Sequence, residues 1–252
     1  MPAAQDSSPD ALAALLRGHF DAVYVVNLPS RADRRREMNA ELRRVGLALD
    51  DGFVRLFNAV RPDGPGKFAN LGEHGCFLSH HAILKAAREA GQDRVLILED
   101  DFNFAPDIGR LLRPVLEALA AEPWGHARLG NLVHDAPDAS PGVVRVPPGQ
   151  ALIATHCIAW RGEAMQRADE FLDLVLSREP GDPAGGPMPV DGAFNTLADQ
   201  QPDLAVYRAV PTLGHQRSSR SDITRHGLER VPGVANVLDV ARRLRRAIRG
   251  GR

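Results

Sequence analysis

The segment from Val95 to Asp101, with the sequence VLILEDD, constrains the fold more than any other part of the chain. Its first four residues, ending at Leu98, form an unbroken apolar run typical of a strand buried on both faces of a parallel sheet. Glu99, Asp100 and Asp101 follow at once, and three carboxylates are costly to bury unpaired. Because open α/β sheets bind ligands just outside the carboxyl ends of their strands, this triplet predicts a functional site.

The chemistry of the triplet favours a hard divalent cation. Mg²⁺ and Mn²⁺ prefer carboxylate oxygens and often bridge them to substrate phosphates. Side chains alternate along an extended chain, so we expect Glu99 and Asp101 on one side and Asp100 on the other. A solvated strand end whose acids bind nothing is the alternative interpretation of the triplet alone.

Composition limits the remaining choices. The chain has 252 residues, 44% of them hydrophobic, which is enough for a large α/β domain, and its formal net charge of −1 argues against a general nucleic-acid binder. The first residues lack the basic start of a signal peptide, and no apolar run approaches the roughly 20 residues of a membrane span. We therefore expect a cytoplasmic protein in which Cys76 and Cys157 form no disulfide and, without a CxxC motif, no zinc site.

Strand and helix patterns alternate along the chain, which favours an α/β fold with a central, mostly parallel sheet. In the second helix Ser30 and Asp33 predict a capping box, and Gly46 suits the position just past the helix end. There is no GxGxxG and no GxxxxGK[ST], so neither a dinucleotide fingerprint nor a P-loop is supported. We predict strands over residues 22–28, 53–59, 95–98, 127–132, 143–146, 151–160 and 204–210, and helices over 9–18, 30–46, 76–90, 106–121 and 161–176.

Two basic segments flank these elements. Arg31 and Arg34 lie in the first turns of a predicted helix, where an arginine opposes the helix dipole unless an anion docks there. The late run PTLGHQRSSRSDI contains His215, Arg217 and Arg220, and its donors suit a pyrophosphate. For Arg31 and Arg34, a solvated helix face that binds no anion is an interpretation of equal weight.

Four stretches together resemble glycosyltransferase family 25, the bacterial lipopolysaccharide glycosyltransferases. They are VYVVNLPSRADRR, GEHGCFLSHHAIL, VLILEDD, and VDGAFNTL with PTLGHQRSSRSDI, between about residues 21 and 223. The resemblance implies a GT-A-like fold and an inverting transfer of a hexose, typically galactose or glucose, from a UDP-sugar with Mn²⁺ or Mg²⁺. It implies a lipopolysaccharide core or related glycan as acceptor, and a domain over 21–226 between an N-terminal helical extension, 1–20, and a basic tail, 227–252. The loop over 61–71 departs from the shorter link seen in many members.

The resemblance also implies roles for single residues. Asp101 would bind the metal, with Glu99 or Asp100 directed to the ribose or to a metal-bound water, and His215 would be a further metal ligand. Asp191, at a predicted helix start beside a Gly/Pro-rich loop, is the candidate general base that an inverting transfer needs. The remaining donor-binding assignments are Asn27, Leu28, Arg31, Arg34, Ser79, His80, Arg217 and Arg220.

Two other functions stay open at this point. One is a non-catalytic protein that binds nucleotide-sugars or glycans, and the other is a metal-dependent nucleotidyltransferase using the same acids. At the end of the chain, residues 237–252 combine an apolar helical stripe with many arginines, which is typical of a membrane-surface helix. We therefore expect peripheral contact with the inner membrane, and a solvated or disordered tail is the alternative.

Overall fold

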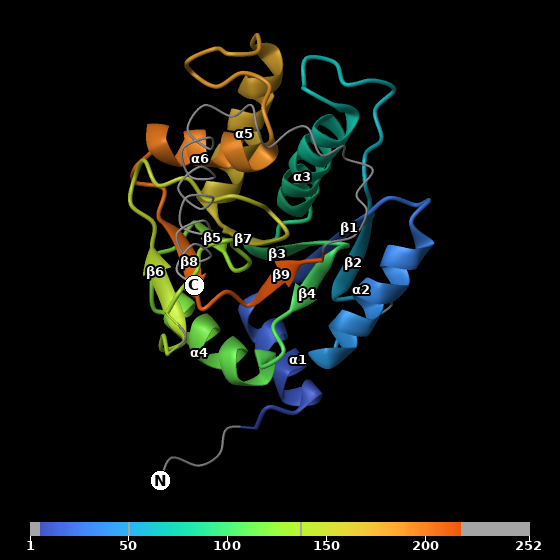
Figure 1. Cartoon of the computed structure of the whole chain (residues 1–252), viewed down its shortest axis with the longest axis vertical. Coiled ribbons are helices and arrows are strands. Elements are labelled where there is room, and N and C mark those ends of the chain that lie inside the picture. The colour runs from blue at the N-terminus through green and yellow to red at the C-terminus, as the bar shows by residue number, and fades with distance from the viewer. Residues whose placement is uncertain (1–5, 50, 137, 218–252) are drawn as a thin grey trace, which may run out of the picture. The chain divides into compact units, whose positions relative to one another are not determined.

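The computed structural model describes residues 6–49, 51–136 and 138–217, which belong to one folded unit. A seven-stranded sheet lies between two layers of helices (Figure 1). The strands are β1 (Ala22–Asn27), β2 (Val54–Asn58), β3 (Arg94–Glu99), β4 (Phe102–Phe104), β5 (His126–Arg128), β6 (Gly142–Arg145), β7 (Cys157–Arg161), β8 (Val206–Val210) and β9 (Gly214–Gln216). The helices are α1 (Pro9–His19), α2 (Ala32–Arg44), α3 (Leu71–Glu89), α4 (Ile108–Ala120), α5 (Glu163–Ser177) and α6 (Val190–Gln200).

The order of the strands in the main sheet is β2-β1-β3-β7-β5-β8-β6. β1 pairs in parallel with both β2 and β3, and β5 pairs in parallel with β8, whereas β7 and β6 run against the other strands. The predicted α/β fold with a mostly parallel central sheet is therefore confirmed, and it is consistent with a GT-A-like fold. A separate two-stranded sheet pairs β4 with β9.

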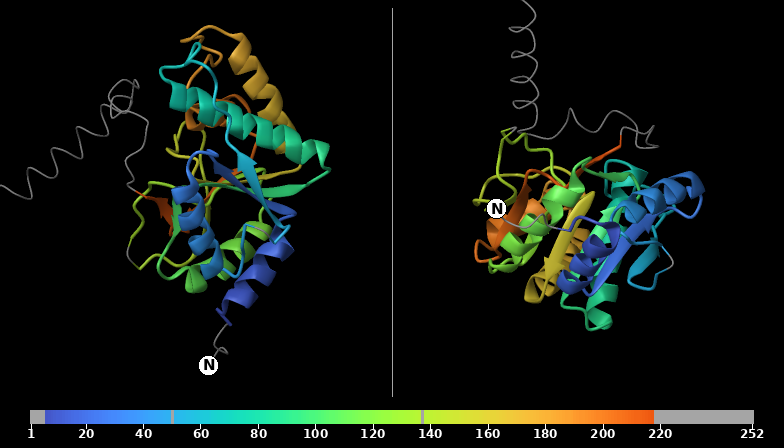
Figure 2. Two further views of the ribbon diagram at one scale, coloured as in Figure 1. Left: turned by 90° about the vertical axis from the view of Figure 1, so that its right-hand side faces the viewer. Right: turned by 90° about the horizontal axis from the view of Figure 1, so that it is seen from below.

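Alternation along the central strands supplies both faces of the sheet with apolar side chains. On β3, Leu96 and Leu98 enter the core under α1, α2 and α4, whereas Val95 and Ile97 enter the core under α3, α5 and α6. Figures 1 and 2 show the helices on the two sides of the sheet. Leu12 and Leu16 of α1 belong to the first of these cores, so the first helix packs on the sheet that carries the site.

Several local predictions are confirmed and others are wrong. Gly46 has the positive φ, 71°, expected just past the end of α2. The capping box at Ser30 does not form, because α2 begins at Ala32 with Arg31 at its N-cap and no side-chain cap bond. α3 begins at Leu71, five residues earlier than predicted, because the Asn70 side chain accepts a hydrogen bond from the Glu73 amide.

The predicted strand over 151–160 is also too long. Only its end, from Cys157, joins the sheet, and the preceding residues form a loop. The prediction that His156 and Cys157 are core residues is confirmed, since both are buried, and both cysteines are free. β4 and β9 were not predicted.

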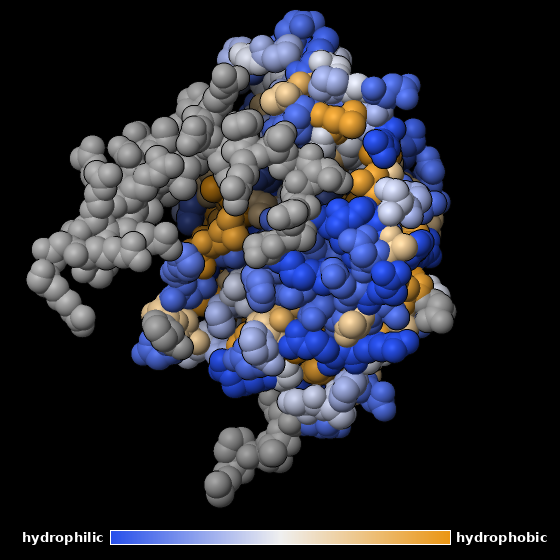
Figure 3. Space-filling view, turned by 45° about the vertical axis from the view of Figure 1, so that its right-hand side comes forward, coloured by the Kyte–Doolittle hydropathy of each residue, from blue (hydrophilic) through white to orange (hydrophobic). Residues whose placement is uncertain are grey.

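The surface in Figure 3 is mostly hydrophilic, with scattered hydrophobic residues. This agrees with helices that turn their apolar sides towards the sheet. No helix in the described parts of the chain is long and apolar enough to cross a membrane. The boundary at residue 226 and the basic tail lie outside the described residues.

Candidate active site

The site forms where β1 and β3 end side by side. Val26 is the register partner of Glu99, so the residues after both strands meet at one edge of the sheet. Asn27 is 1% exposed, and its Nδ2 donates a hydrogen bond of 2.7 Å to Asp100 Oδ2. The backbone amide of Asp100 donates to the Val26 carbonyl at 3.1 Å. Asp100 is thus held against the end of the first strand.

Arg34 on α2 reaches two of the acids. Its Nη1 lies 3.0 Å from Asp100 Oδ1 and 3.4 Å from Asp101 Oδ2. The expectation that Asp100 would point away from Asp101 is therefore wrong. The chain leaves the extended conformation at Glu99, and the next two residues lie in a turn, where alternation no longer applies.

Asp101 is the least satisfied of the acids. It is 6% exposed, and its Oδ1 has no hydrogen-bond partner. Burial and the nearby charge of Glu99 raise its pKa to about 6, although Gln216 and Arg34 oppose the shift. Burial also raises the pKa of Asp100, although Asn27 and Arg34 oppose the shift. A buried carboxylate with an unused oxygen is a group suited to a cation.

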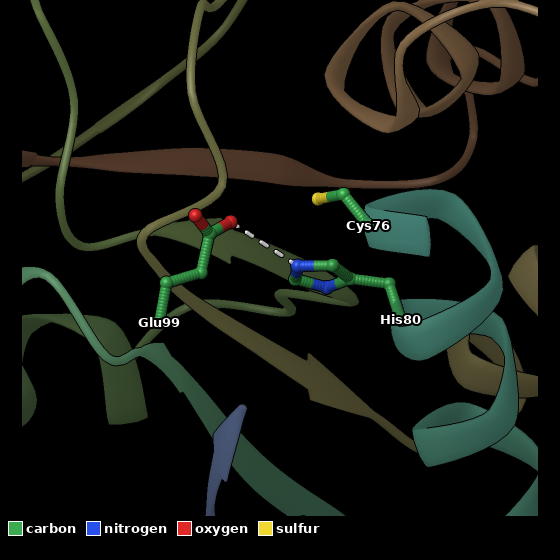
Figure 4. A group of neighbouring side chains, drawn as sticks. All are labelled: Cys76, His80 and Glu99. Carbon is green, nitrogen blue, oxygen red and sulfur yellow. Dashed lines mark hydrogen bonds and ion pairs between the residues drawn. The ribbon is translucent and has the colours of Figure 1, made fainter. Parts of the chain in front are cut away.

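Glu99 turns towards α3 and the loop before β7. His80 Nε2 lies 3.2 Å from Glu99 Oε1, and the Thr155 hydroxyl donates to the same oxygen at 2.6 Å. Burial would raise the pKa of Glu99, but the hydrogen bonds from His80 and Thr155 hold it below its usual value. Figure 4 shows Cys76 beside this pair, and burial raises the pKa of its thiol well above the usual value. Glu99 is thus an ionised group held from two sides.

The sequence around Cys76 explains how α3 reaches this position. A Cβ added at Gly75 would lie 2.7 Å from the Val60 carbonyl oxygen, so only glycine allows the helix so close to the segment after β2. The Ser79 hydroxyl donates to the Gly75 carbonyl at 2.6 Å and accepts from the Val60 amide at 2.8 Å. Ser79 is therefore a buried docking residue one position before His80.

Pairing of β4 with β9 brings the late polar run to the acids. A Cβ at Gly214 would lie 2.2 Å from the Asn103 carbonyl oxygen, so this pairing requires glycine. Gln216 Nε2 donates to Asp101 Oδ2 at 3.1 Å. Arg217 donates from its amide to the Asp101 carbonyl at 2.7 Å and from Nη2 to the Asp100 carbonyl at 2.6 Å.

The structure brings Gln216 to Asp101, and not the predicted ligand His215. His215 pairs with Asn103 across the small sheet and is exposed. Neighbouring residues of a strand point to opposite faces, so a Gln216 side chain that contacts Asp101 turns His215 away from it. Arg220 lies outside the described residues.

Leu28 and Arg31 lie between β1 and α2. The Arg31 amide donates to the Leu28 carbonyl at 2.8 Å, and the Asn27 side chain donates to the Arg31 carbonyl at 3.2 Å. The Arg31 guanidinium pairs with Asp33 at 2.8 Å. Both predicted residues thus stay beside Asn27, on the turn that follows the first strand.

Asp191 lies in the first turn of α6, as the sequence predicted. Its Oδ2 accepts a hydrogen bond from the Ala154 amide at 2.9 Å, and its Oδ1 accepts from the Gly192 amide at 2.8 Å. Ala154 has a φ of 76°, a left-handed conformation rare for alanine. Arg128, 1% exposed, donates to the Ala154 carbonyl at 2.6 Å. Asp191 and Arg128 therefore hold this strained residue from both sides, next to Thr155.

Three contributors to the site were not assigned from the sequence: Arg128, Thr155 and Gln216. Arg128 and Thr155 were placed in predicted strands, and no local pattern separates them from core positions. Gln216 stands in the polar run that suggested a pyrophosphate site, so its composition was the available signal.

Comparisons with known proteins bear on the same residues. The model of glycosyltransferase family 25 (LPS biosynthesis protein) matches residues 55–129, which include the α3 motif and the acids after β3. Over this segment the chain is similar to glycosyltransferase family 25.

Relatives of the chain include the human inactive glycosyltransferase 25 family member 3, which is 28% identical over 199 residues that cover 65% of this chain and 33% of the relative. The mouse procollagen galactosyltransferase 2 is 26% identical over 194 residues, covering 64% of this chain and 31% of the relative. The chain thus spans about a third of the length of these curated relatives.

Among solved structures, the chain is similar to a glycosyltransferase involved in the glycosylation of the major capsid of PBCV-1. The TM-score is 0.39 at 14% identity, over 65% of this chain and 68% of the other.

Proposed function

We propose that this chain is an inverting glycosyltransferase that moves a hexose, galactose or glucose, from a UDP-sugar to a lipopolysaccharide core or related glycan. The convergence of Glu99, Asp100 and Asp101 with Arg34 and Arg217 at the carboxyl edge of parallel strands carries the proposal. Anionic diphosphates bind at such edges, and arginine offers paired donors to phosphate oxygens.

We propose Mn²⁺ or Mg²⁺ as the cofactor. The donor set fits such an ion, because Asp101 has a buried Oδ1 without a hydrogen-bond partner and the neighbouring acids supply further oxygens. When bound, the ion would neutralise charge on the leaving diphosphate. Asp101 would hold it, with Glu99 directed to a bound water or the ribose. His215 is left out of the proposed set because it turns away from Asp101.

The chain's own residues supply the rest of the proposed mechanism. Asn27, Leu28 and Arg31 would line the nucleotide pocket beside β1, and Arg34, Arg217 and Arg220 would hold the diphosphate. Asp191 would accept the proton of the acceptor hydroxyl. Its two backbone hydrogen bonds orient the carboxylate, and its oxygens keep lone pairs for a proton.

A second function, non-catalytic binding of a nucleotide-sugar or glycan, is favoured by one observation. The Arg34 guanidinium lies 3.0 Å from Asp100 and 3.4 Å from Asp101, where it neutralises acids that a metal would otherwise share. The human relative named inactive glycosyltransferase 25 family member 3 is a second reason to keep this alternative.

Release of UDP from UDP-galactose and UDP-glucose, with a saccharide acceptor, separates the two functions. A transferase should release UDP faster with Mn²⁺ than with a chelator, and mass analysis should find a hexose added to the acceptor. Tight binding of UDP-sugar with no metal-dependent product would support the binding protein and refute the transferase.

For localisation we propose peripheral contact with the inner membrane through residues 237–252, which lie outside the described residues. The support is their sequence alone: an anionic leaflet attracts each nearby arginine by about 1 kcal/mol. Such contact would bring the site close to a lipid-linked acceptor.

A further inference from the structure

A second group of metal-ligating side chains lies between α3 and α5 and shares no residue with the candidate active site. It consists of His81 on α3 and of Asp169 and Asp173 on α5. The two aspartates are four residues apart, which places them on one face of the helix. His81 Nε2 lies 2.9 Å from Asp169 Oδ1 and 3.4 Å from Asp173 Oδ1. Three ligand atoms from two elements thus converge.

The contacts within this group are not those of an ordinary hydrogen-bonded pair. Asp169 is 6% exposed, yet its Oδ1 has no hydrogen-bond partner, and neither has His81 Nε2 at 2.9 Å from it. The two atoms are close but misaligned for an N–H···O bond. Ligands of a tetrahedral zinc ion with bonds of about 2.0–2.1 Å lie about 3.3 Å apart. The 3.4 Å distance to Asp173 is near that value, and the 2.9 Å distance to Asp169 is shorter but joins two atoms that form no hydrogen bond.

The surroundings suit a bound ion. The Arg88 guanidinium contacts the other oxygen of Asp169, which fixes the orientation of that carboxylate in the way that outer partners orient metal ligands. The Asp173 side chain is 72% exposed, which leaves a path for the ion and room for a water ligand. One imidazole with two carboxylates favours Zn²⁺ over Mg²⁺, which prefers oxygen ligands alone.

We propose that His81, Asp169 and Asp173 bind a divalent transition-metal ion, with Zn²⁺ as the best fit, that ties α3 to α5. The helices lie side by side in Figures 1 and 2. α3 carries Cys76 and His80 into the candidate active site, and α5 leads through the loop over 178–189 to Asp191. The ion would therefore brace two walls of that site. The proposal does not depend on the proposed transfer reaction.

The test compares Asp173→Asn with Glu170→Gln in the full chain. Asp173 is exposed, so its replacement leaves the fold intact, and Glu170 is an exposed acid on α5 outside the cluster. Zn²⁺ is titrated calorimetrically into chelator-treated protein in excess Mg²⁺, which occupies sites made of oxygen ligands alone. Wild type and Glu170→Gln should each bind one equivalent of Zn²⁺. Asp173→Asn should bind this equivalent about 100-fold more weakly, because losing a ligand costs at least as much affinity as losing a residue that orients a ligand.

Two further measurements complete the test. Zn²⁺ should raise the melting temperature of wild type and Glu170→Gln more than that of Asp173→Asn, because the ion binds only the folded site. Co²⁺ bound in place of Zn²⁺ should show the visible absorption of a tetrahedral site in the same two proteins. Equal affinity and stoichiometry for Zn²⁺ in Asp173→Asn and Glu170→Gln would overturn the proposal, and would leave an ion-pair network of Arg88, His81 and the two aspartates.

Discussion

Replacing Asp101 by asparagine should make the metal-free protein more stable while it removes activity. The side chain keeps its size but loses a charge that the fold tolerates poorly. A pKa raised from 3.8 to about 6 means that ionised Asp101 costs the folded state about 3 kcal/mol relative to its neutral form. Since 1 kcal/mol shifts the melting temperature of a domain this size by about 2–4 °C, Asp101→Asn should melt roughly 6–12 °C higher in a chelator at pH 8.

The pH dependence of this gain has a definite sign. Because the folded pKa of Asp101 is raised, its favourable contribution is fully present below about pH 3.8 and is lost as the pH rises through about 6. The advantage of Asp101→Asn should therefore be largest at pH 8 and shrink towards zero near pH 4. Denaturant unfolding at both pH values, in a chelator, measures the difference. Asp33→Asn is the control, since Arg31 lowers the pKa of that carboxyl, and its removal should not stabilise the protein.

Activity and metal response complete this prediction. Asp101→Asn should lose metal-dependent transfer by on the order of 10³-fold or more, and Mn²⁺ should stabilise the wild type but not the mutant. If the mutant is no more stable than wild type at pH 8, the electrostatic reasoning is refuted. If it is more stable but turns over normally at saturating Mn²⁺, the metal assignment is refuted instead.

Three further outcomes follow from the site and the tail. Asp191→Asn should lower kcat with little change in UDP-sugar affinity, because a base acts in the transition state; lost affinity with kcat preserved would make it a donor ligand. Thr155→Val should cost about 1.5–3 kcal/mol of unfolding free energy in urea, since it removes a 2.6 Å bond to the Glu99 carboxylate; an unchanged midpoint would contradict that contact. Deleting residues 237–252 should abolish co-sedimentation with anionic vesicles but spare transfer to a soluble acceptor; a full-length protein that ignores such vesicles at low salt refutes the membrane prediction.

The sequence by itself determined the elements whose signal is local. The apolar run before Glu99 predicted a buried strand with acids at its end, and the structure has β3 ending at Glu99. Asp191 was expected at a helix start and lies in the first turn of α6. In each case hydrophobic periodicity or a terminus signal within about ten residues carries the information, because it reflects which side of one element faces the core.

Only the tertiary structure decided how distant segments meet. Gln216 contacts Asp101 because β9 pairs with β4, and Thr155 contacts Glu99 because the chain before β7 leaves the sheet. The same pairing turns His215 away from Asp101, because His215 is one residue before Gln216 and neighbouring side chains of a strand point to opposite faces. Strand pairing and polar contacts depend on partners 56 to 115 residues away, and no pattern within one element encodes which partner a side chain will find.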